Sequence, residues 1–216
     1  MRLSELYIFD MDGVLLDSEP VVTRAAMEAL RAYGVETQYA DFLPFTGMGE
    51  IRFIGGVAEK YGRPFEEGMK TLTYEIYCRH AKNEVFVYPW TRPMLEHLLS
   101  HGKKIAVASA ADRIKVTCNL GCIGFDTSFF SAIVTGSEIV RNKPAPDIFL
   151  KAAEMAGFAP TDCTVTEDAL SGVMAAKAAG MRSVAVTTSF PAERLRDAGA
   201  DFVTDDLYAL VRDLVR

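Results

Sequence analysis

The second half of the chain alternates short apolar runs with segments of helical pattern, and this alternation limits the possible folds more than any other feature. The runs are rich in β-branched residues and do not alternate polar with apolar positions, which is typical of strands buried on both faces of a parallel sheet. They cover residues 104–109, 131–135, 163–167, 183–187 and 201–204. Helical patterns separate them, beginning near Pro93, Asp147 and Ser171, and each ends at a glycine. This order predicts an α/β fold with a doubly wound, mainly parallel sheet.

The first half of the chain has a different pattern. One apolar run at residues 6–9 has strand composition, and about seventy residues without strand character follow it. Within them, apolar residues recur at helical spacing in the segments 22–33, 51–61 and 69–77. An all-helical block directly after the first strand predicts a cap over the carboxyl edge of the sheet, where ligands bind in open α/β sheets. We therefore predict a core formed by residues 1–15 and 87–216, and an α-helical cap formed by residues 16–86.

Composition and charge exclude several classes of protein. With 216 residues, of which 50% are hydrophobic, the chain suffices for one large domain or one domain with an insert. A formal charge of −6 offers no basic field to a nucleic-acid backbone. No apolar stretch is long enough to span a membrane, and Glu5 and Asp10 in the first apolar run exclude a secretory signal. We expect a cytoplasmic protein in which the scattered Cys78, Cys118, Cys122 and Cys163 are free thiols.

Two carboxylates, Asp10 and Asp12, follow the first apolar run immediately before Gly13. Residues i and i+2 of a strand point to the same face. Like charges so close repel each other unless a cation lies between them or one binds a proton. The ordinary alternative is a solvated turn at the end of a strand. A folding requirement alone does not explain the pair, whereas a site that uses one carboxylate as nucleophile or metal ligand and the other as acid and base does.

Three further polar elements lie at the carboxyl ends of predicted strands. Ser109 and Ala110 end the run 104–109, Lys143 opens the segment 143–147, and Glu167 with Asp168 ends the run 163–167. Taken singly, each has a simpler explanation as a helix cap, a solvated loop lysine or an acidic turn. Their joint occurrence at one sheet edge favours an active site.

These residue types fit phosphoryl transfer through an aspartyl phosphate. Asp10 would attack phosphorus as the nucleophile, and Asp12 would protonate the leaving alkoxide and then activate water. Mg²⁺ would be bound by the carboxylates of Asp10 and Asp168 and by the main-chain carbonyl of Asp12. Glu167 would bind the ion directly or through water. This is the oxygen-only ligand set that magnesium prefers.

The substrate's phosphate group needs its own ligands, because the chain as a whole is acidic. Lys143 and the Ser109 hydroxyl would bind the non-bridging phosphate oxygens, and N–H groups at the turn of Ala110 would assist them. The expected partner is a small phosphorylated metabolite, with no nucleic acid and no membrane. The sequence leaves open which metabolite this is, and whether the chain is a monomer or a weak dimer.

With these motifs in this order, the chain resembles the haloacid dehalogenase-like hydrolase superfamily over essentially its whole length. The segments Asp12–Pro20 and Lys143–Asp147 are most similar to the branch with a small α-helical cap, which contains β-phosphoglucomutase, phosphoglycolate phosphatase and sugar-phosphate phosphatases. The resemblance implies a Rossmann-like catalytic core and a flap after Asp12 that joins core to cap. It also implies a magnesium-dependent phosphatase acting on a sugar or polyol phosphate. Dehalogenases lack the second aspartate, so Asp12 favours phosphate chemistry.

Two differences from the branch concern the main alternative, a phosphosugar mutase. Val22 stands where β-phosphoglucomutase has a cap histidine, and the arginine expected in the next cap segment falls near Glu50, although Arg52 could partly substitute. A mutase must hold a second phosphate with cap groups, so these differences favour a phosphatase. A third possibility is a binding protein that keeps the fold without turnover, and the intact acidic residues and Lys143 argue against it.

Two smaller differences concern the core. Ala169 replaces the usual serine after the Glu-Asp pair, and Trp90 replaces the glycine that usually follows the proline at the return from cap to core, here Pro89. We expect altered packing at this return, where Trp90 would lie with Tyr88 and Phe86, and no loss of chemistry.

Overall fold

A computed structural model describes residues 4–46 and 49–215 of the chain. It divides into two compact units. One contains residues 1–17, 87–110 and 123–216, and is called the sheet unit below. The other contains residues 18–86 and 111–122, and is called the helical unit. Within the described residues, no helix is long and apolar enough to cross a membrane.

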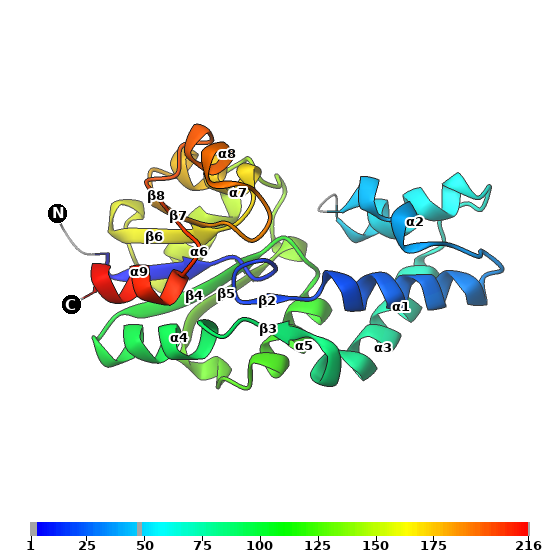
Figure 1. Cartoon of the computed structure of the whole chain (residues 1–216), viewed down its shortest axis with the longest axis horizontal. Helices are drawn as coiled ribbons and strands as arrows, with labels where there is room; N and C mark the ends of the chain where they lie inside the picture. Colours follow the sequence, from blue (N-terminus) through cyan, green and yellow to red (C-terminus); the bar gives the residue numbers. More distant parts are fainter. Residues whose placement is uncertain (1–3, 47–48, 216) are drawn as a thin grey trace. The chain divides into compact units, whose positions relative to one another are not determined.

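The sheet unit is built on a six-stranded sheet (Figure 1) with the strand order β5-β4-β1-β6-β7-β8. All its neighbouring strands are parallel. The strands are β1 (Leu6–Phe9), β4 (Lys104–Ser109), β5 (Phe130–Thr135), β6 (Cys163–Glu167), β7 (Arg182–Val186) and β8 (Phe202–Thr204). The α/β fold predicted from the alternating runs is therefore confirmed. Two short strands, β2 (Leu16–Asp17) and β3 (Phe86–Val87), form a separate two-stranded sheet that the sequence pattern did not indicate.

Helices cover both faces of this sheet. Their bounds are α4 (Thr91–Ser100), α6 (Asp147–Ala156), α7 (Leu170–Ala178), α8 (Ala192–Asp197) and α9 (Leu207–Leu214). Leu6 and Ile8 point to the face on which Phe149 of α6 and Ala176 of α7 are buried. Helix α4 packs on β4 and against α9. Every residue of β1 is fully buried, which explains why this run contains no alternating polar residues.

The strand order fixes the position of the candidate site. From β1 the chain proceeds outward through β4 to β5, then returns to the other side of β1 and proceeds through β6 and β7 to β8. The direction of winding therefore reverses between β1 and β6. Ligands of open α/β sheets bind at the carboxyl ends of the strands beside such a reversal. Asp10 directly follows β1, and Glu167 is the last residue of β6.

The helical unit contains α1 (Glu19–Ala32), α2 (Glu50–Lys60), α3 (Glu67–Glu84) and α5 (Arg113–Ile123, whose last residue is assigned to the sheet unit). Short 3₁₀ turns lie at Tyr39–Asp41 and Leu43–Phe45. The apolar faces of α1, α2 and α3 meet in one buried cluster that includes Leu30, Ile54 and Tyr77. Helices therefore lie where the spacing of apolar residues predicted them.

Helix α5 changes the division of the chain that the sequence suggested. Residues 111–122 group with the helical unit, although the sequence analysis assigned all of 87–216 to the core. The reason is packing, since α5 is joined to α3 by a disulfide between Cys78 and Cys118. The expectation of free thiols is therefore wrong for these two residues. Cys122 and Cys163 are free.

Candidate active site

Asp10 occupies the first position after β1, where the buried strand opens into a loop. Its N–H donates to the carbonyl oxygen of Thr166 at 2.9 Å, which continues the β1–β6 ladder by one residue. The residue is only 9% exposed. The chain then folds back tightly, because the N–H groups of Val14 and Leu15 both donate to the carbonyl of Met11. Strand end and tight turn together hold the carboxylate of Asp10 at the sheet edge.

Lys143 is the central contact of the site. Its Nζ lies 2.5 Å from Asp10 Oδ1 and 2.5 Å from Glu167 Oε1, so one ammonium group joins the ends of β1 and β6. The side chain is buried among these partners, at 10% exposure, and its Nζ lies 5.0 Å from the ring centre of Phe149. The sequence analysis placed Lys143 at the same edge as a phosphate ligand, and the structure brings it into direct contact with Asp10.

The Lys143 loop is fixed from both sides. The guanidinium of Arg141 donates to both carboxylate oxygens of Asp147, at 3.0 Å and 2.7 Å, and this pair closes the loop before α6. Because Asp147 begins α6, its negative charge also lies at the positive end of the helix dipole. A lysine side chain has many rotamers. A loop closed by the Arg141–Asp147 pair fixes the backbone of Lys143 and so limits the positions that its ammonium group can reach.

The carboxylate of Glu167 accepts hydrogen bonds from the backbone of the two residues that follow it. Oε2 accepts the N–H groups of Asp168 and Ala169 at 3.0 Å and 2.9 Å, while Oε1 accepts from Lys143. The side chain is almost fully buried. Gly172, in the first turn of α7, leaves the space in which the carboxylate lies, since a Cβ at Gly172 would overlap it. The partners present orient Glu167 toward Lys143 and toward the start of α7.

Asp168 is also buried, at 6% exposure, and it has partners from two loops. The Ser189 hydroxyl donates to its Oδ2. Gly13 packs so closely that a Cβ there would overlap the Asp168 carboxylate, and its φ of 77° also favours glycine. The Thr188 hydroxyl donates to the carbonyl of Gly13 at 2.6 Å. The loop after β7 therefore holds both Asp168 and the turn after Asp12.

Thr188 and Ser189 were not among the site residues predicted from the sequence. Both follow β7, which ends at Val186, and so they lie at the same edge of the sheet as Asp10 and Glu167. The available signal was the polar pair Thr188–Ser189 directly after the predicted strand 183–187. Polar residues at the end of this strand share the sheet edge with Asp10, as those at the ends of the other strands do.

Ser109 and Ala110 lie where the pattern placed them, at the carboxyl end of β4. Ser109 is the last residue of that strand, is 3% exposed, and is paired in register with Thr135 of β5. The carbonyl of Ala110 packs against Gly136, where a Cβ would overlap it. Because β4 neighbours β1, this turn lies on the same edge as Asp10.

The electrostatics of the site are dominated by its acidic residues. Burial is the main reason that the pKa of Asp10 is raised to about 7, with the charges of Glu167 and Asp12 acting in the same direction and Lys143 opposing them. Burial and the charges of Glu167 and Asp10 also raise the pKa of Asp168. Burial alone would lower the pKa of Lys143, but Asp10 and Glu167 outweigh it and raise this pKa. Lys143 thus contacts two of the site's carboxylates, Asp10 and Glu167, while the charges of Asp12 and Asp168 add to the negative charge around Asp10 and Glu167.

A divalent cation would offset this excess of negative charge. Among residues 4–46 and 49–215, no three His, Cys, Asp or Glu side chains are placed to bind a metal ion by themselves. The expected ligand set does not require a third side chain, because it consists of two carboxylates, a main-chain carbonyl and water. Mg²⁺ usually keeps several waters and is bound by one or two carboxylates. The two buried acids with raised pKa, Asp10 and Asp168, are the groups whose charge such an ion would stabilise.

Comparison with known proteins agrees with this geometry. The sequence pattern of the haloacid dehalogenase-like hydrolase family matches residues 5–180. The chain is 44% identical, over 93% of its length, to Protein SUPPRESSOR OF QUENCHING 1, chloroplastic, of Arabidopsis thaliana, but it spans only 19% of that longer protein. It is 30% identical to the fructose-1-phosphate phosphatase YqaB of Escherichia coli, covering 83% of this chain and 94% of that one.

A solved structure with the same architecture is CbbY from Rhodobacter sphaeroides in complex with phosphate. It has a TM-score of 0.81 and 25% identity to this chain, and the match covers 96% of each chain.

Proposed function

The chain belongs to the haloacid dehalogenase-like hydrolase family, and we propose that it is a magnesium-dependent phosphatase of a small phosphorylated metabolite, a sugar or polyol phosphate. The observation that carries this proposal is the contact of Lys143 with both Asp10 and Glu167, beside the reversal of the strand order. A buried carboxylate at the carboxyl end of a strand, with the Lys143 ammonium at its side, is suited to attack a phosphoryl group. The fructose-1-phosphate phosphatase activity named for one relative supports the substrate class.

The reaction would proceed in two steps. In the first, a carboxylate oxygen of Asp10 attacks phosphorus, and the bond from phosphorus to the leaving oxygen breaks as the aspartyl phosphate forms. Asp12 gives its proton to the leaving alkoxide. In the second, Asp12 takes a proton from water as that water attacks phosphorus, which releases inorganic phosphate and restores Asp10. Lys143, Ser109 and the N–H groups beside Ala110 would bind the phosphate oxygens.

Magnesium would be held by the carboxylates of Asp10 and Asp168 and by the main-chain oxygen of Asp12. When bound, it would neutralise charge between the anionic nucleophile and the anionic phosphate. The contacts of Glu167 with Lys143 and with two N–H groups favour a positioning role, with any contact to the ion made through water. Ser189 would orient Asp168 toward the ion, as the outer partners of metal ligands do.

We favour hydrolysis over mutase chemistry because of residues in the helical unit. Val22 is buried, at 4% exposure, in the apolar cluster of α1, α2 and α3, so it offers no hydrogen bond to a substrate. Glu50 lies beside Tyr74 and contributes to raising the pKa of that phenol. A mutase must rebind its bisphosphate through donor groups, and neither position carries one.

The proposal is tested by phosphate release from a panel of phosphorylated metabolites with magnesium, ranked by kcat/KM. Asp10→Asn is the control, since the amide cannot attack phosphorus, and its activity should fall below about 1% of wild type. A hexose 1-phosphate should give inorganic phosphate and little hexose 6-phosphate, with or without hexose 1,6-bisphosphate as a primer. If the primed reaction forms isomer tenfold faster than phosphate, the enzyme is a mutase. If Asp10→Asn keeps wild-type turnover, the site is wrongly assigned.

Two further expectations stay predictions. The partner is proposed to be the small metabolite alone, without nucleic acid or membrane, and the oligomeric state is left open. A cytoplasmic location was inferred partly from free thiols, and that support is lost with the Cys78–Cys118 bridge. Fractionation of the native cell is the experiment that tests the cytoplasmic location.

A further inference from the structure

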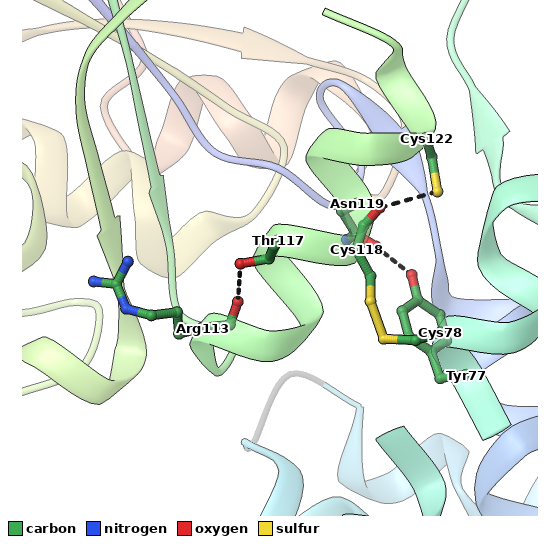
Figure 2. The surroundings of a disulfide bond; sticks show 7 residues. All are labelled: Tyr77, Cys78, Arg113, Thr117, Cys118, Asn119 and Cys122. Carbon is green, nitrogen blue, oxygen red and sulfur yellow. Dashed lines mark hydrogen bonds between the residues drawn. A yellow bond between two sulfur atoms is a disulfide. The ribbon is translucent and has the colours of Figure 1, made fainter. Parts of the chain in front are cut away.

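The helical unit contains a disulfide that joins α3 to α5. Figure 2 shows Tyr77 and Cys78 of one helix facing Cys118 and Asn119 of the other. The two Cα atoms of the bridge lie 5.8 Å apart, and the bridge spans 40 positions of the sequence. Both cysteines are partly exposed, so a reductant in solution can reach the bridge without unfolding the unit.

Helix α5 depends on contacts outside itself for its order. Its sequence, RIKVTCNLGCI, contains four β-branched residues, a glycine, an asparagine and two cysteines, all of which have weak helix propensity. Such a segment of eleven residues would not be a stable helix alone in water. The covalent bond from Cys118 to Cys78 is therefore a main restraint on the middle of α5.

Other contacts join α5 to α3 without a covalent bond. The Tyr77 hydroxyl donates to Asn119 Oδ1, and the Tyr74 hydroxyl donates to Asp112 Oδ2 at 3.3 Å. Lys70 Nζ lies 3.5 Å from Asp112. These contacts keep the two helices associated when the bridge is open, so reduction should loosen α5 and not unfold the unit.

The interface between α3 and α5 also contains an unfavourable buried group, and the bridge helps to hold α5 in place despite it. Asn119 is fully buried, and its Nδ2 donates to no partner in the described protein. A buried amide without a partner is unfavourable. Once the bridge is open, a small movement of α5 that keeps the Tyr77–Asn119 hydrogen bond could give Asn119 Nδ2 access to water and relieve this cost. Opening the bridge should therefore favour a less ordered α5.

Helix α5 is also continuous with the turn that we propose binds phosphate. Asp112 accepts the first backbone hydrogen bond of the helix, from the Val116 N–H at 3.1 Å. Only Ala111 separates Asp112 from Ala110, whose carbonyl packs against Gly136 of the sheet unit. Movement of the first turn of α5 is therefore transmitted through one residue to Ala110 and Ser109.

We propose that the Cys78–Cys118 pair is a reversible redox modification site that controls the order of α5 and, through it, the phosphate affinity of the Ser109–Ala110 turn. The link to phosphate rests on the function proposed above. A dithiol reductant transfers two electrons and two protons: the S–S bond breaks, two S–H bonds form, and the dithiol closes to its own disulfide. The bridged form binds phosphate tightly, and the reduced form binds it weakly. An oxidised dithiol reverses the step.

Cys122 provides a matched control. It lies one turn after Cys118 on α5, where its Sγ donates to the carbonyl of Cys118 at 3.2 Å, but it is not bridged. Burial raises the pKa of its thiol, which makes it a poor nucleophile toward the bridge. Cys122→Ser should therefore keep the redox response, whereas Cys78→Ser and Cys118→Ser should lose it.

The experiment compares the protein after oxidised glutathione and after dithiothreitol. Amide hydrogen exchange is read over residues 109–123, and binding of inorganic phosphate is measured with magnesium present. Reduction should speed exchange in this segment by about tenfold or more and weaken phosphate binding by about fivefold or more, with exchange in β6 and β7 unchanged. Cys78→Ser should behave like the reduced protein under both conditions, and Cys122→Ser like the wild type.

Amide hydrogen exchange tests the redox proposal even if no metabolite is hydrolysed. The redox proposal and the proposed phosphatase function can therefore fail independently of each other. Equal exchange in the oxidised and reduced protein would overturn the inference. So would four alkylatable thiols after oxidation, or a response of equal size in Cys78→Ser. Faster exchange with unchanged phosphate binding would overturn the link to the Ser109–Ala110 turn.

Discussion

Replacing Gly172 by alanine tests how the site is packed, because two physical effects predict opposite results. Gly172 lies in the first turn of α7 at an ordinary helical conformation, so alanine is allowed by the backbone. On helix propensity alone, Gly172→Ala should stabilise the protein by up to about 1 kcal/mol. The structure predicts the reverse, since the new Cβ would overlap the carboxylate of Glu167.

The size of the destabilisation follows from the interactions that the Glu167 carboxylate would lose. Its carboxylate is nearly fully buried and accepts from Lys143, Asp168 N–H and Ala169 N–H. Breaking a buried charge pair costs about 3–5 kcal/mol. Subtracting the gain in helix propensity leaves a net loss of about 2–4 kcal/mol in the free energy of unfolding. Lys143 would lose its orientation as well, so kcat/KM should fall by about a hundredfold.

The assay is denaturant unfolding together with kcat/KM on the best substrate of the panel. Gly121→Ala is the matched control, because Gly121 is an exposed helical glycine of α5 with open space at its Cβ position. It should stabilise the protein by up to about 1 kcal/mol without changing activity. In a Glu167→Ala background the overlap is gone, so Gly172→Ala should no longer destabilise. If Gly172→Ala alone has an unfolding free energy within about 0.5 kcal/mol of wild type and an unchanged kcat/KM, the reasoning is refuted.

Four further outcomes are expected. Asp12→Ala should lower kcat about a hundredfold on alkyl phosphates but less on aryl phosphates, and equal losses in the phosphorylation step would exclude leaving-group protonation. Chelation should abolish turnover, magnesium should restore it and calcium should inhibit; full activity without metal would contradict the site. Ser189→Ala should raise the magnesium concentration for half-maximal activity about tenfold or more, measured by titration against Thr187→Ala. Asp41→Asn should lower the Tm at pH 7, because the Lys60 ammonium, the Gln38 N–H and the Tyr61 hydroxyl lower the pKa of Asp41 to about 2. That difference should shrink from pH 4 toward pH 2, as Asp41 is protonated in the wild type; a constant Tm difference over this range would contradict the assignment.

The strands, and the edge at which the candidate site residues lie, could be predicted because they depend on local sequence. A strand buried on both faces has no solvent-facing set of charged residues, so the interiors of β4 (KIAVAS) and β6 (CTVTE) stand out as uncharged runs rich in apolar and β-branched residues. Polar residues at the carboxyl ends of such runs must then share one edge of a parallel sheet. That single constraint was enough to associate Asp10 with Lys143 and Glu167, which lie more than a hundred residues away from Asp10.

The cysteine pairing could not be predicted in the same way. Cys78 and Cys118 meet because α5 packs on α3, and nothing in the local sequence of α5 indicates which helix it contacts. The weak amphipathic pattern of α5 also hides its buried face. Pairing also depends on the redox conditions around the protein, which the sequence of residues does not record. Ser189 differs from the cysteines, because it follows β7 directly and its contact with Asp168 comes from the shared sheet edge.

The charge balance of the site explains why metal and substrate should depend on each other. Lys143 contacts two carboxylates, Asp10 and Glu167, with a single positive charge, and burial already disfavours the charged forms of Asp10 and Asp168. A phosphate group adds further negative charge to this edge of the sheet. A divalent ion held by the carboxylates would offset this charge, so that Lys143, which contacts Asp10 and Glu167, could also donate to a phosphate oxygen. Loss of activity on chelation should therefore include loss of phosphate binding, and not only a slower chemical step.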